Sequence, residues 1–411
     1  MGWTTRILIS FLLGQTGLAL GLRPAHAQDV PYEKYKLENG LTVILHEDHS
    51  LPKVALDLWY RVGSRDELAG RSGFAHLFEH LMFKGTRRAP ANIFKRIEGN
   101  GGSCNGYTTE DRTVYISGGP PELLPLLLWL EADRIEQLGG ILDEEKLGRE
   151  RDVVRNERRS GYDNQPYGRV ELRLPELMYP PDHPYGHPVI GYHQDLIAAT
   201  LPEAKDFFAT YYVPSNLSMC IAGDFDSAKV KAQIAELFGT LPRAPRPGQR
   251  MKAVPRLDRV VRATLLDRVN LTKVVMAFHA PARFTPGEAE MQLAAAILGR
   301  GQASRLYKRL VMQDKLAISV GVWQDCRQLG SSFEIEAMLP PGGNPDAYEK
   351  AVDEELVTFA RTGPTEEELT RHKAMHELNM LEQMADEAWT EIQAGQARPM
   401  VFTEDGEIAP G

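Results

Sequence analysis

The feature that most constrains this chain is a short apolar segment, Gly73 to Phe83, that contains two histidines and a glutamate. The spacing of its apolar residues predicts one short helix. His76 and His80 are four residues apart, so on a helix they lie on the same face. Glu79 directly precedes His80 and would lie beside both imidazoles. Burying these groups among Leu, Phe and Met side chains is costly unless something is bound to them.

Two imidazoles at this spacing suit a tetrahedral zinc ion, and Glu79 could take a proton from a water that the metal activates. The alternative is a polar patch on an ordinary helix. A catalytic zinc also needs a third protein ligand. A second predicted helix, 143–160, offers four glutamates, of which Glu150 and Glu157 are seven apart and share a face. The residues alone do not choose between Glu150 and Glu157.

The first 27 residues differ from the rest of the chain. Arg6 precedes an apolar run, Ile7 to Leu22, and the segment ends Ala25-His26-Ala27. This pattern is typical of a secretory signal peptide cleaved after Ala27, so we expect a periplasmic or secreted protein with no membrane anchor after cleavage. A membrane-spanning helix is a poor alternative because the segment is rich in glycine. Without it the chain has 45 basic and 56 acidic residues, a net charge of −11, which argues against a nucleic-acid partner.

The remaining chain reads as two similar halves, 28–242 and 257–394, followed by a short tail, 395–411. The segment between them, 243–256, is basic and proline-rich, which predicts a linker. Each half runs through strands, a helix, further strands and long helices, and the second half has no His/Glu cluster of its own. We expect Val260 to Leu266 to be a strand of the second half.

Other polar residues are interpreted as structural. The three cysteines, Cys104, Cys220 and Cys326, are odd in number and far apart, so no disulfide framework is predicted. His183 and His187 lie among prolines and read as loop residues. His372 and His376 are four apart on a helix but stand among charged residues, which favours a solvated face.

A family resemblance supplies what the residues leave open. His76-Leu77-Phe78-Glu79-His80 is the inverted zincin signature, and Glu157 follows 77 residues after His80 in a Val-Val-x-Asn-Glu run. With these motifs the chain resembles the M16 family, which includes the pitrilysin, insulin-degrading and mitochondrial processing peptidases. The resemblance implies an α+β fold of two homologous α/β-sandwich domains, like those of LuxS and M16 metalloenzymes. Each domain would have a mostly antiparallel sheet with helices packed on one side.

The resemblance also implies roles for individual residues. His76, His80 and Glu157 match ligands of one Zn²⁺ per chain, Glu79 matches the general base, and Glu150 matches a second acidic residue that supports the site. The run Asn105, Gly106, Tyr107 and Thr108 resembles an edge strand to which a peptide substrate adds as an extra strand. Cys104, next to it, reads as a wall residue. The implied activity is a zinc endopeptidase acting on short or unfolded peptides.

One part of the family pattern is absent. Related peptidases complete the site with an Arg and a Tyr from the second half, which grip the substrate and steady the oxyanion. Here these positions are Val311 and Ile318. A heterodimer with a homologous subunit that carries the Arg and Tyr is therefore predicted. The alternative function is a metal-binding but non-hydrolytic scaffold or assembly subunit of the same family. The intact Glu79 argues against this alternative, because a scaffold has no need of a general base.

Overall fold

The structure is a computed structural model that describes residues 31–90, 92–375, 401–402 and 408–409. The predicted signal peptide, 1–27, lies outside the described residues. Of the tail 395–411, only β10 (Val401–Phe402) and β11 (Ile408–Ala409) are described, and they pair antiparallel. Among the described residues, no helix combines the length and the apolar composition that a membrane span requires.

The first sheet has six strands in the order β1-β2-β6-β3-β5-β4. Neighbouring strands run antiparallel except β2 and β6, which are parallel. Strand β4 lies at one edge, so one side of its backbone has no strand partner among the described residues. The strands are β1 (Glu33–Lys36), β2 (Thr42–Glu47), β3 (Val54–Tyr60), β4 (Ser103–Thr108), β5 (Thr113–Gly119) and β6 (Leu217–Gly223).

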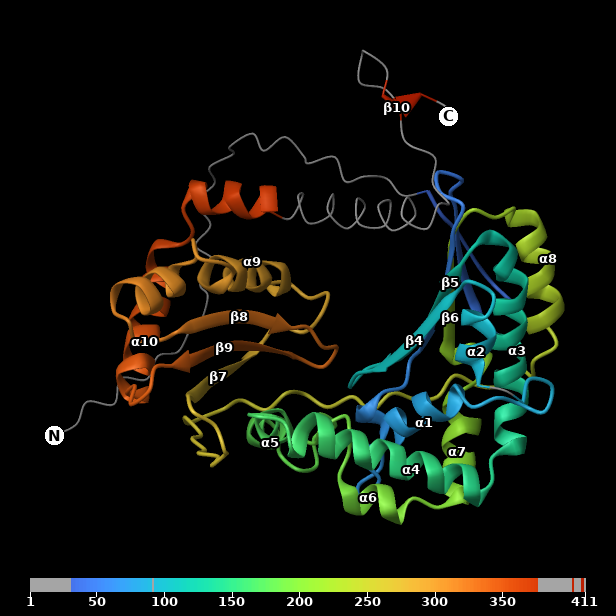
Figure 1. Cartoon of the computed structure of the whole chain (residues 1–411), viewed down its shortest axis with the longest axis horizontal. Coiled ribbons are helices and arrows are strands. Elements are labelled where there is room, and N and C mark those ends of the chain that lie inside the picture. The colour runs from blue at the N-terminus through green and yellow to red at the C-terminus, as the bar shows by residue number, and fades with distance from the viewer. Residues whose placement is uncertain (1–30, 91, 376–400, 403–407, 410–411) are drawn as a thin grey trace. The chain divides into compact units, whose positions relative to one another are not determined.

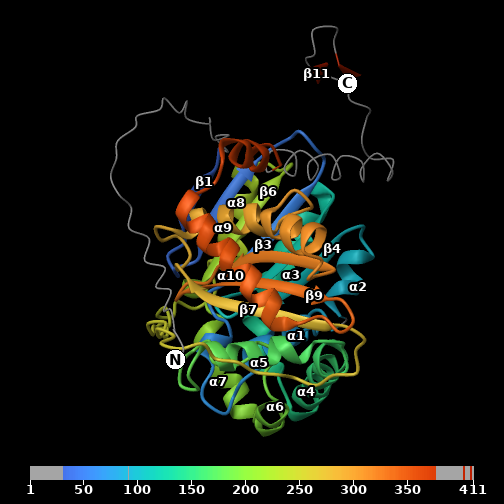
Figure 2. The ribbon, with the colours of Figure 1, turned by 90° about the vertical axis from the view of Figure 1, so that its left-hand side faces the viewer.

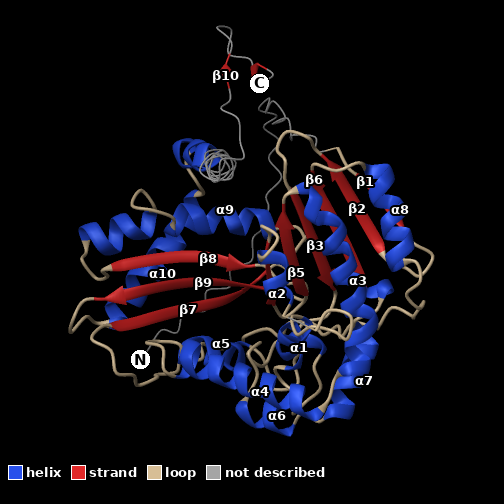
Figure 3. Cartoon of the chain, turned by 45° about the vertical axis from the view of Figure 1, so that its right-hand side comes forward, coloured by secondary structure: helices blue, strands red, loops and turns tan. Residues whose placement is uncertain are grey.

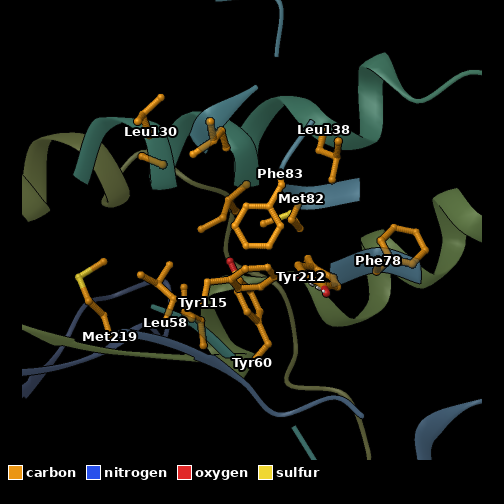
Figure 4. Close-up of a cluster of buried hydrophobic side chains, with 14 of the residues drawn as sticks. Leu58, Tyr60, Phe78, Met82, Phe83, Tyr115, Leu130, Leu138, Tyr212 and Met219 are labelled. Carbon is orange, nitrogen blue, oxygen red and sulfur yellow. Dashed lines mark hydrogen bonds between the residues drawn. The ribbon is translucent and has the colours of Figure 1, made fainter. Parts of the chain in front are cut away.

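One face of this sheet carries the main core. Along β3, Leu56, Leu58 and Tyr60 are fully buried, whereas Trp59 is exposed on the opposite face. Helices α3 (Leu124–Ile141) and α8 (Ser227–Phe238) cover the buried face (Figures 1 and 3). Helix α1 (Phe74–Met82) adds Phe78 and Met82 to this core, beside the tyrosines of the sheet (Figure 4). Full burial of such a side chain contributes about 1.5–3 kcal/mol, so α1 is held firmly in place.

The other helices of the first half lie around α1. They are α2 (Ile93–Glu98), α4 (Glu144–Arg158), α5 (Arg169–Met178), α6 (His193–Ala198) and α7 (Leu201–Tyr211). Helix α4 packs along α1. It begins after Asp143, whose side chain accepts a hydrogen bond from the Lys146 N–H and so caps the helix. A turn of π-helix, Arg159–Asp163, extends it past the predicted end.

The second half has a three-stranded antiparallel sheet in the order β7-β9-β8, with helices on one face (Figure 2). This order repeats β3-β5-β4 of the first sheet, with α9 in the place of α1 and α10 in the place of α3. The predicted fold class, two α/β halves with mostly antiparallel sheets, is confirmed. The elements are β7 (Thr272–Ala280), α9 (Glu288–Gly299), a π-helix (Tyr307–Gln313), β8 (Ser319–Asp325), β9 (Ser331–Leu339) and α10 (Pro345–Thr362), followed by a helix over 366–375.

Two predictions for the second half are wrong. Val260 to Leu266 forms no strand, and Val260 and Leu266 are 74% and 85% exposed. In the first sheet β2 is held by β6, and the described residues of the second half contain no counterpart of β6 for this segment to pair with. His372 is buried, not solvated. The same helix carries Glu368, which accepts a hydrogen bond from Arg305. His376 lies outside the described residues.

Candidate metal centre

The N-terminus of helix α1 is fixed by residues far from it in sequence. Gly73 has φ +89°, and a Cβ there would lie 2.9 Å from the Ile190 carbonyl oxygen, so the chain needs glycine at this point. The Glu67 carboxylate accepts hydrogen bonds from the N–H groups of Gly73 (2.9 Å) and Ala75 (2.8 Å). A carboxylate here satisfies free backbone donors and complements the helix dipole. Burial raises the pKa of Glu67 well above its usual value.

Three predicted ligands come together between α1 and α4. The rings of His76 and His80 have centroids 4.8 Å apart. Glu157 of α4 faces both, with Oε1 3.7 Å from His76 Nε2 and Oε2 3.1 Å from His80 Nε2. Their ligand atoms all lie within 4.8 Å of one another, and within the described ranges no other His, Cys, Asp and Glu group meets that condition.

The donor set fits a zinc ion. Burial, and next the charge of His80, hold the pKa of His76 down to about 4, so its imidazole is neutral and able to bind a cation. The hydrogen bond to His80 is the main cause that lowers the pKa of Glu157, which keeps its carboxylate ionised. The His76 and His80 side chains are 12% and 22% exposed, and that of Glu157 is 45% exposed. Two imidazoles and one carboxylate, open on one side, are the ligands of a catalytic zinc site.

Glu79 lies beside this group but points toward the sheet edge. It is buried, and it accepts a 2.7 Å hydrogen bond from the Thr108 hydroxyl of β4. Burial raises the pKa of its carboxyl group. Gly106 of β4 lets the strand approach the helix, because a Cβ there would come within 3.0 Å of the Phe83 ring and 3.2 Å of Glu79 Cγ. The edge strand therefore rests directly against α1.

The four predicted substrate-binding residues, Asn105 to Thr108, all lie in this edge strand. Its inner neighbour is β5, in an antiparallel register that pairs Gly106 with Tyr115 and Thr108 with Thr113. Cys104 packs partly against the first core, and burial raises the pKa of its thiol to about 11. Cys104 is not among the residues that line the cavity beside the cluster, so it belongs to the core of the sheet and not to the predicted wall.

The two glutamates that the sequence left as alternatives occupy different places. Glu157 faces the Nε2 atoms of the histidines, whereas Glu150 lies behind His80, with Oε2 3.9 Å from His80 Nδ1. Glu150 is almost fully buried, and its Oε1 is 3.0 Å from Lys84 Nζ. The 3.9 Å separation is too long for a hydrogen bond, so Glu150 Oε2 lies near the second ring nitrogen without bonding to it. The geometry thus separates a candidate ligand from a candidate supporting residue.

A cavity of about 450 Å³ opens beside the cluster. Its walls combine the metal-site residues, strand β4 with the turn that follows it, and the loop after β8 in the second half. Val311 packs against the second core and Ile318 is 49% exposed, and neither lines the cavity. The lining residues that the sequence did not predict are Thr109, Glu110, Asp111, Arg112, Tyr162, Val189, Ile190, Asp325, Cys326 and Arg327.

The loop after β8 is tied to the turn after β4 by buried polar contacts. Arg327 Nη1 lies 3.1 Å from Glu110 Oε1, and the Gln328 N–H donates to Asp111 at 2.8 Å. Arg65, fully buried, donates to both Asp111 and Gln328 at 2.8 Å. In the sequence, Asp325 to Gln328 is only a polar turn between two strands, and no local signal shows that it reaches the first half.

Comparison with known proteins agrees with this architecture. Residues 42–190 match the insulinase family, peptidase family M16, and residues 198–375 match the M16 inactive domain. The chain is 32% identical over 342 residues to the zinc protease PqqE of Helicobacter pylori, covering 81% of this chain and 75% of that protein. The crystal structure of a protease from Helicobacter pylori superposes with a TM-score of 0.80 at 29% identity, covering 86% and 85% of the two chains. The periplasmic protease PqqL of Escherichia coli shares the fold, with a TM-score of 0.68 at 21% identity, covering 88% of this chain and 41% of that one.

Proposed function

Because the chain belongs to the M16 (insulinase) family of peptidases, we propose that it is a zinc-dependent endopeptidase that hydrolyses short or unfolded peptides. The observation that carries the proposal is the place of Glu79. Its carboxylate lines the same cavity as His76 and Glu157 and is held by Thr108. A protein that only bound a metal would need the three ligands but not a buried acid beside them.

We assign His76, His80 and Glu157 as the residues that hold one zinc ion. When bound, the ion supplies Lewis-acid activation of water and of a carbonyl oxygen. Glu150 is assigned as a positioning residue behind His80, and Lys84 balances its charge at 3.0 Å. An unpaired buried carboxylate would be costly, and the contact with Lys84 gives this one a partner of opposite charge.

Glu79 carries the proton transfers in this proposal. It accepts a proton from the attacking water and later gives it to the leaving amine. The hydroxyl of Thr108 binds Oε2, which fixes the orientation of the carboxylate and leaves Oε1 for the proton. Because Thr108 belongs to β4, the same strand positions the base and borders the cavity.

The proposed binding place for the substrate is the edge of β4 that pairs with no other described strand. An extended peptide that pairs with Asn105 to Thr108 makes main-chain hydrogen bonds that do not depend on its side chains. Only a short or unfolded chain can present such a backbone. Gly106 and Thr108 face α1, so a peptide on this edge lies next to Glu79.

We further propose that a homologous subunit completes the site with an Arg and a Tyr. Val311 and Ile318 stand at those positions here, and neither reaches the cavity. Arg327 does reach it, but Glu110 and Asp325 engage its guanidinium. The periplasm is the proposed location, supported by the pattern of residues 1–27 and by the periplasmic protease PqqL, which has this fold.

The test uses Glu79→Gln with a matched control, Glu290→Gln, an exposed glutamate on α9, the helix in the corresponding place. Zinc content and cleavage of fluorogenic peptides are measured for the chain alone and with a candidate partner. We expect Glu79→Gln to retain one zinc and to lose about 10²–10⁴-fold in kcat, and Glu290→Gln to behave as the unsubstituted protein. Cleavage that Glu79→Gln leaves intact contradicts the mechanism, and a full rate without a partner contradicts the two-subunit site.

A second candidate function is a zinc-binding but non-hydrolytic scaffold or assembly subunit. The replacement of the family's Arg and Tyr by Val311 and Ile318 favours it. It predicts stoichiometric zinc and stable association with a homologous chain, with no peptide cleavage by the complex. In that case Glu79→Gln would change neither the zinc content nor the association.

A further inference from the structure

Arg112 lines the cavity, and within the described part of the chain it has no partner in an ion pair. It lies in the turn between β4 and β5, and its guanidinium carbon is 4.8 Å from the ring centroid of Trp59 and 5.7 Å from that of Tyr107. Across residues 31–90 and 92–375, no carboxylate forms an ion pair with Arg112, and its buried Nε has no hydrogen-bond partner. The side chain is thus held by two aromatic rings and not by an opposite charge.

The other charged groups that line the cavity all have partners. Arg327 is bound by Glu110 and Asp325. Asp111 accepts hydrogen bonds from Arg65 at 2.8 Å and from the Tyr185 hydroxyl at 2.6 Å. Glu79 and Glu157 belong to the metal centre. Among the described residues that line the cavity, Arg112 is therefore the charged group that has no partner of opposite charge. An anionic group of a ligand that enters the cavity could provide that partner.

The Arg112 side chain lies on the face of the sheet that points away from α1. Gly106 and Thr108 of β4 face α1, so Tyr107 between them faces the opposite side. Tyr107 pairs with Val114, which pairs with Trp59, and Trp59 is exposed on that same side. In a peptide strand added to β4, every second side chain would point toward this side, where Arg112 rests on the two rings.

We propose that Arg112 is a specificity-determining residue that binds a carboxylate of the substrate, so that the site prefers acidic peptides. The inference rests on the proposed peptidase function and names the substrate class of that site. A guanidinium can bind a carboxylate through two parallel hydrogen bonds, and stacking on Trp59 and Tyr107 fixes its plane in advance. The carboxylate can come from an acidic side chain or from the C-terminus of the peptide.

The test measures binding, so that it does not depend on turnover. The full chain, zinc-loaded and carrying Glu79→Gln, is titrated into fluorescent peptides while anisotropy is recorded. One peptide set is polar, has an amidated C-terminus and carries a single Glu moved through each position. A second set has Gln at every position, and a third is the Gln peptide with a free C-terminal carboxylate. Each is measured with Arg112 present, with Arg112→Gln, with Arg112→Glu and with the control Arg87→Gln, an exposed arginine of the first half.

With Arg112 present we expect Glu at one or two positions to tighten binding about 10- to 100-fold over Gln, in line with charge-assisted hydrogen bonds. Arg112→Gln removes the difference, Arg112→Glu disfavours the acidic peptide, and Arg87→Gln leaves the preference in place. Tight binding of the third set instead assigns the C-terminal carboxylate as the ligand. Equal affinity for all sets, no binding of any, or a preference that survives Arg112→Gln overturns the proposal.

A parallel cleavage assay, with Glu79 intact and the candidate partner added, separates this inference from the proposed function. Cleavage of Glu and Gln peptides at equal kcat/KM supports a peptidase but overturns the role of Arg112. Binding that depends on Arg112, with no cleavage of any peptide, supports the acidic-ligand site and contradicts the endopeptidase.

Discussion

The two halves of the chain share an order of elements but differ in what their helices bring together. In the first half, α1 carries His76, Glu79 and His80 under the strand pair β4 and β5. In the second half, α9 lies in the same place relative to β8 and β9, yet its sequence there is Leu293-Ala294-Ala295-Ala296. The core packing that places the helix is thus common to both halves, whereas the metal-site chemistry belongs to side chains of one.

The helix that follows α3 in the first half and the helix that follows α10 in the second half show the same contrast. In the first half this is α4, whose Glu157 faces two imidazoles. In the second half it is the helix 366–375, whose Glu368 binds the guanidinium of Arg305, with both N···O distances 2.7 Å. A carboxylate from the same element therefore meets imidazoles in one half and a fixed cation in the other. The second half thus keeps the order of elements without the His/Glu cluster, and its loop after β8 contacts the turn after β4 of the first half.

The prediction with the largest expected effect tests whether zinc binding depends on the first half alone. Glu157→Gln removes the anionic donor between His76 and His80, and we expect loss of stoichiometric zinc on dialysis and loss of peptide cleavage. The matched substitution, Glu366→Gln on the corresponding helix of the second half, is expected to keep both. Zinc is measured by elemental analysis of the dialysed proteins. Equal zinc loss in both variants would break the contrast between the halves.

The sequence predicted the first half better than the second, for physical reasons. The proposed ligands on α1 and the proposed base are encoded by i, i+3 and i, i+4 spacing within five residues, which a single helix realises without help from the rest of the fold. The choice between Glu150 and Glu157 needed the family resemblance, because both share a face of α4. The structure separates them by the ring nitrogen that each one faces.

What the sequence missed depends on contacts between distant segments. Arg327 reaches the cavity only because the loop after β8 binds the turn after β4, and nothing in its local sequence shows that contact. The apolar pattern of Val260 to Leu266 is that of a strand, but a strand also needs a neighbour with which to pair. His372 stands among charged residues in sequence, yet it is only 7% exposed in the fold.

A prediction with a smaller expected effect compares how closely the edge strands β4 and β8 pack against the neighbouring side chains. Gly106→Ala in β4 places a Cβ within 3.0 Å of the Phe83 ring and 3.2 Å of Glu79, whereas Gly321→Ala in β8 meets only Trp323, at 3.5 Å. We expect Gly106→Ala to lower the free energy of unfolding by about 1–3 kcal/mol through overpacking and to reduce cleavage by displacing Glu79. Gly321→Ala is expected to stay within about 0.5 kcal/mol. Chemical denaturation gives the free energy of unfolding, and peptide cleavage gives kcat/KM. If Gly106→Ala changed neither quantity, β4 would not set the position of Glu79.

The prediction with the smallest expected effect concerns the Arg305–Glu368 ion pair of the second half, which involves the helix that corresponds to α4. The hydrogen bond from Arg305 is the main cause that lowers the pKa of Glu368 to about 2. A carboxyl group with a depressed folded pKa stabilises the protein above its unfolded pKa of about 4.3, and this contribution is lost as the pH falls toward about 2. Because the pair is partly solvated, we expect Glu368→Gln to cost about 1 kcal/mol at pH 7. The difference in Tm from the unsubstituted protein should shrink steadily between pH 5 and pH 3, while Glu367→Gln, at an exposed neighbour, shows no such trend. A Tm difference that stays constant over this range would mean that Glu368 acts through packing and not through its charge.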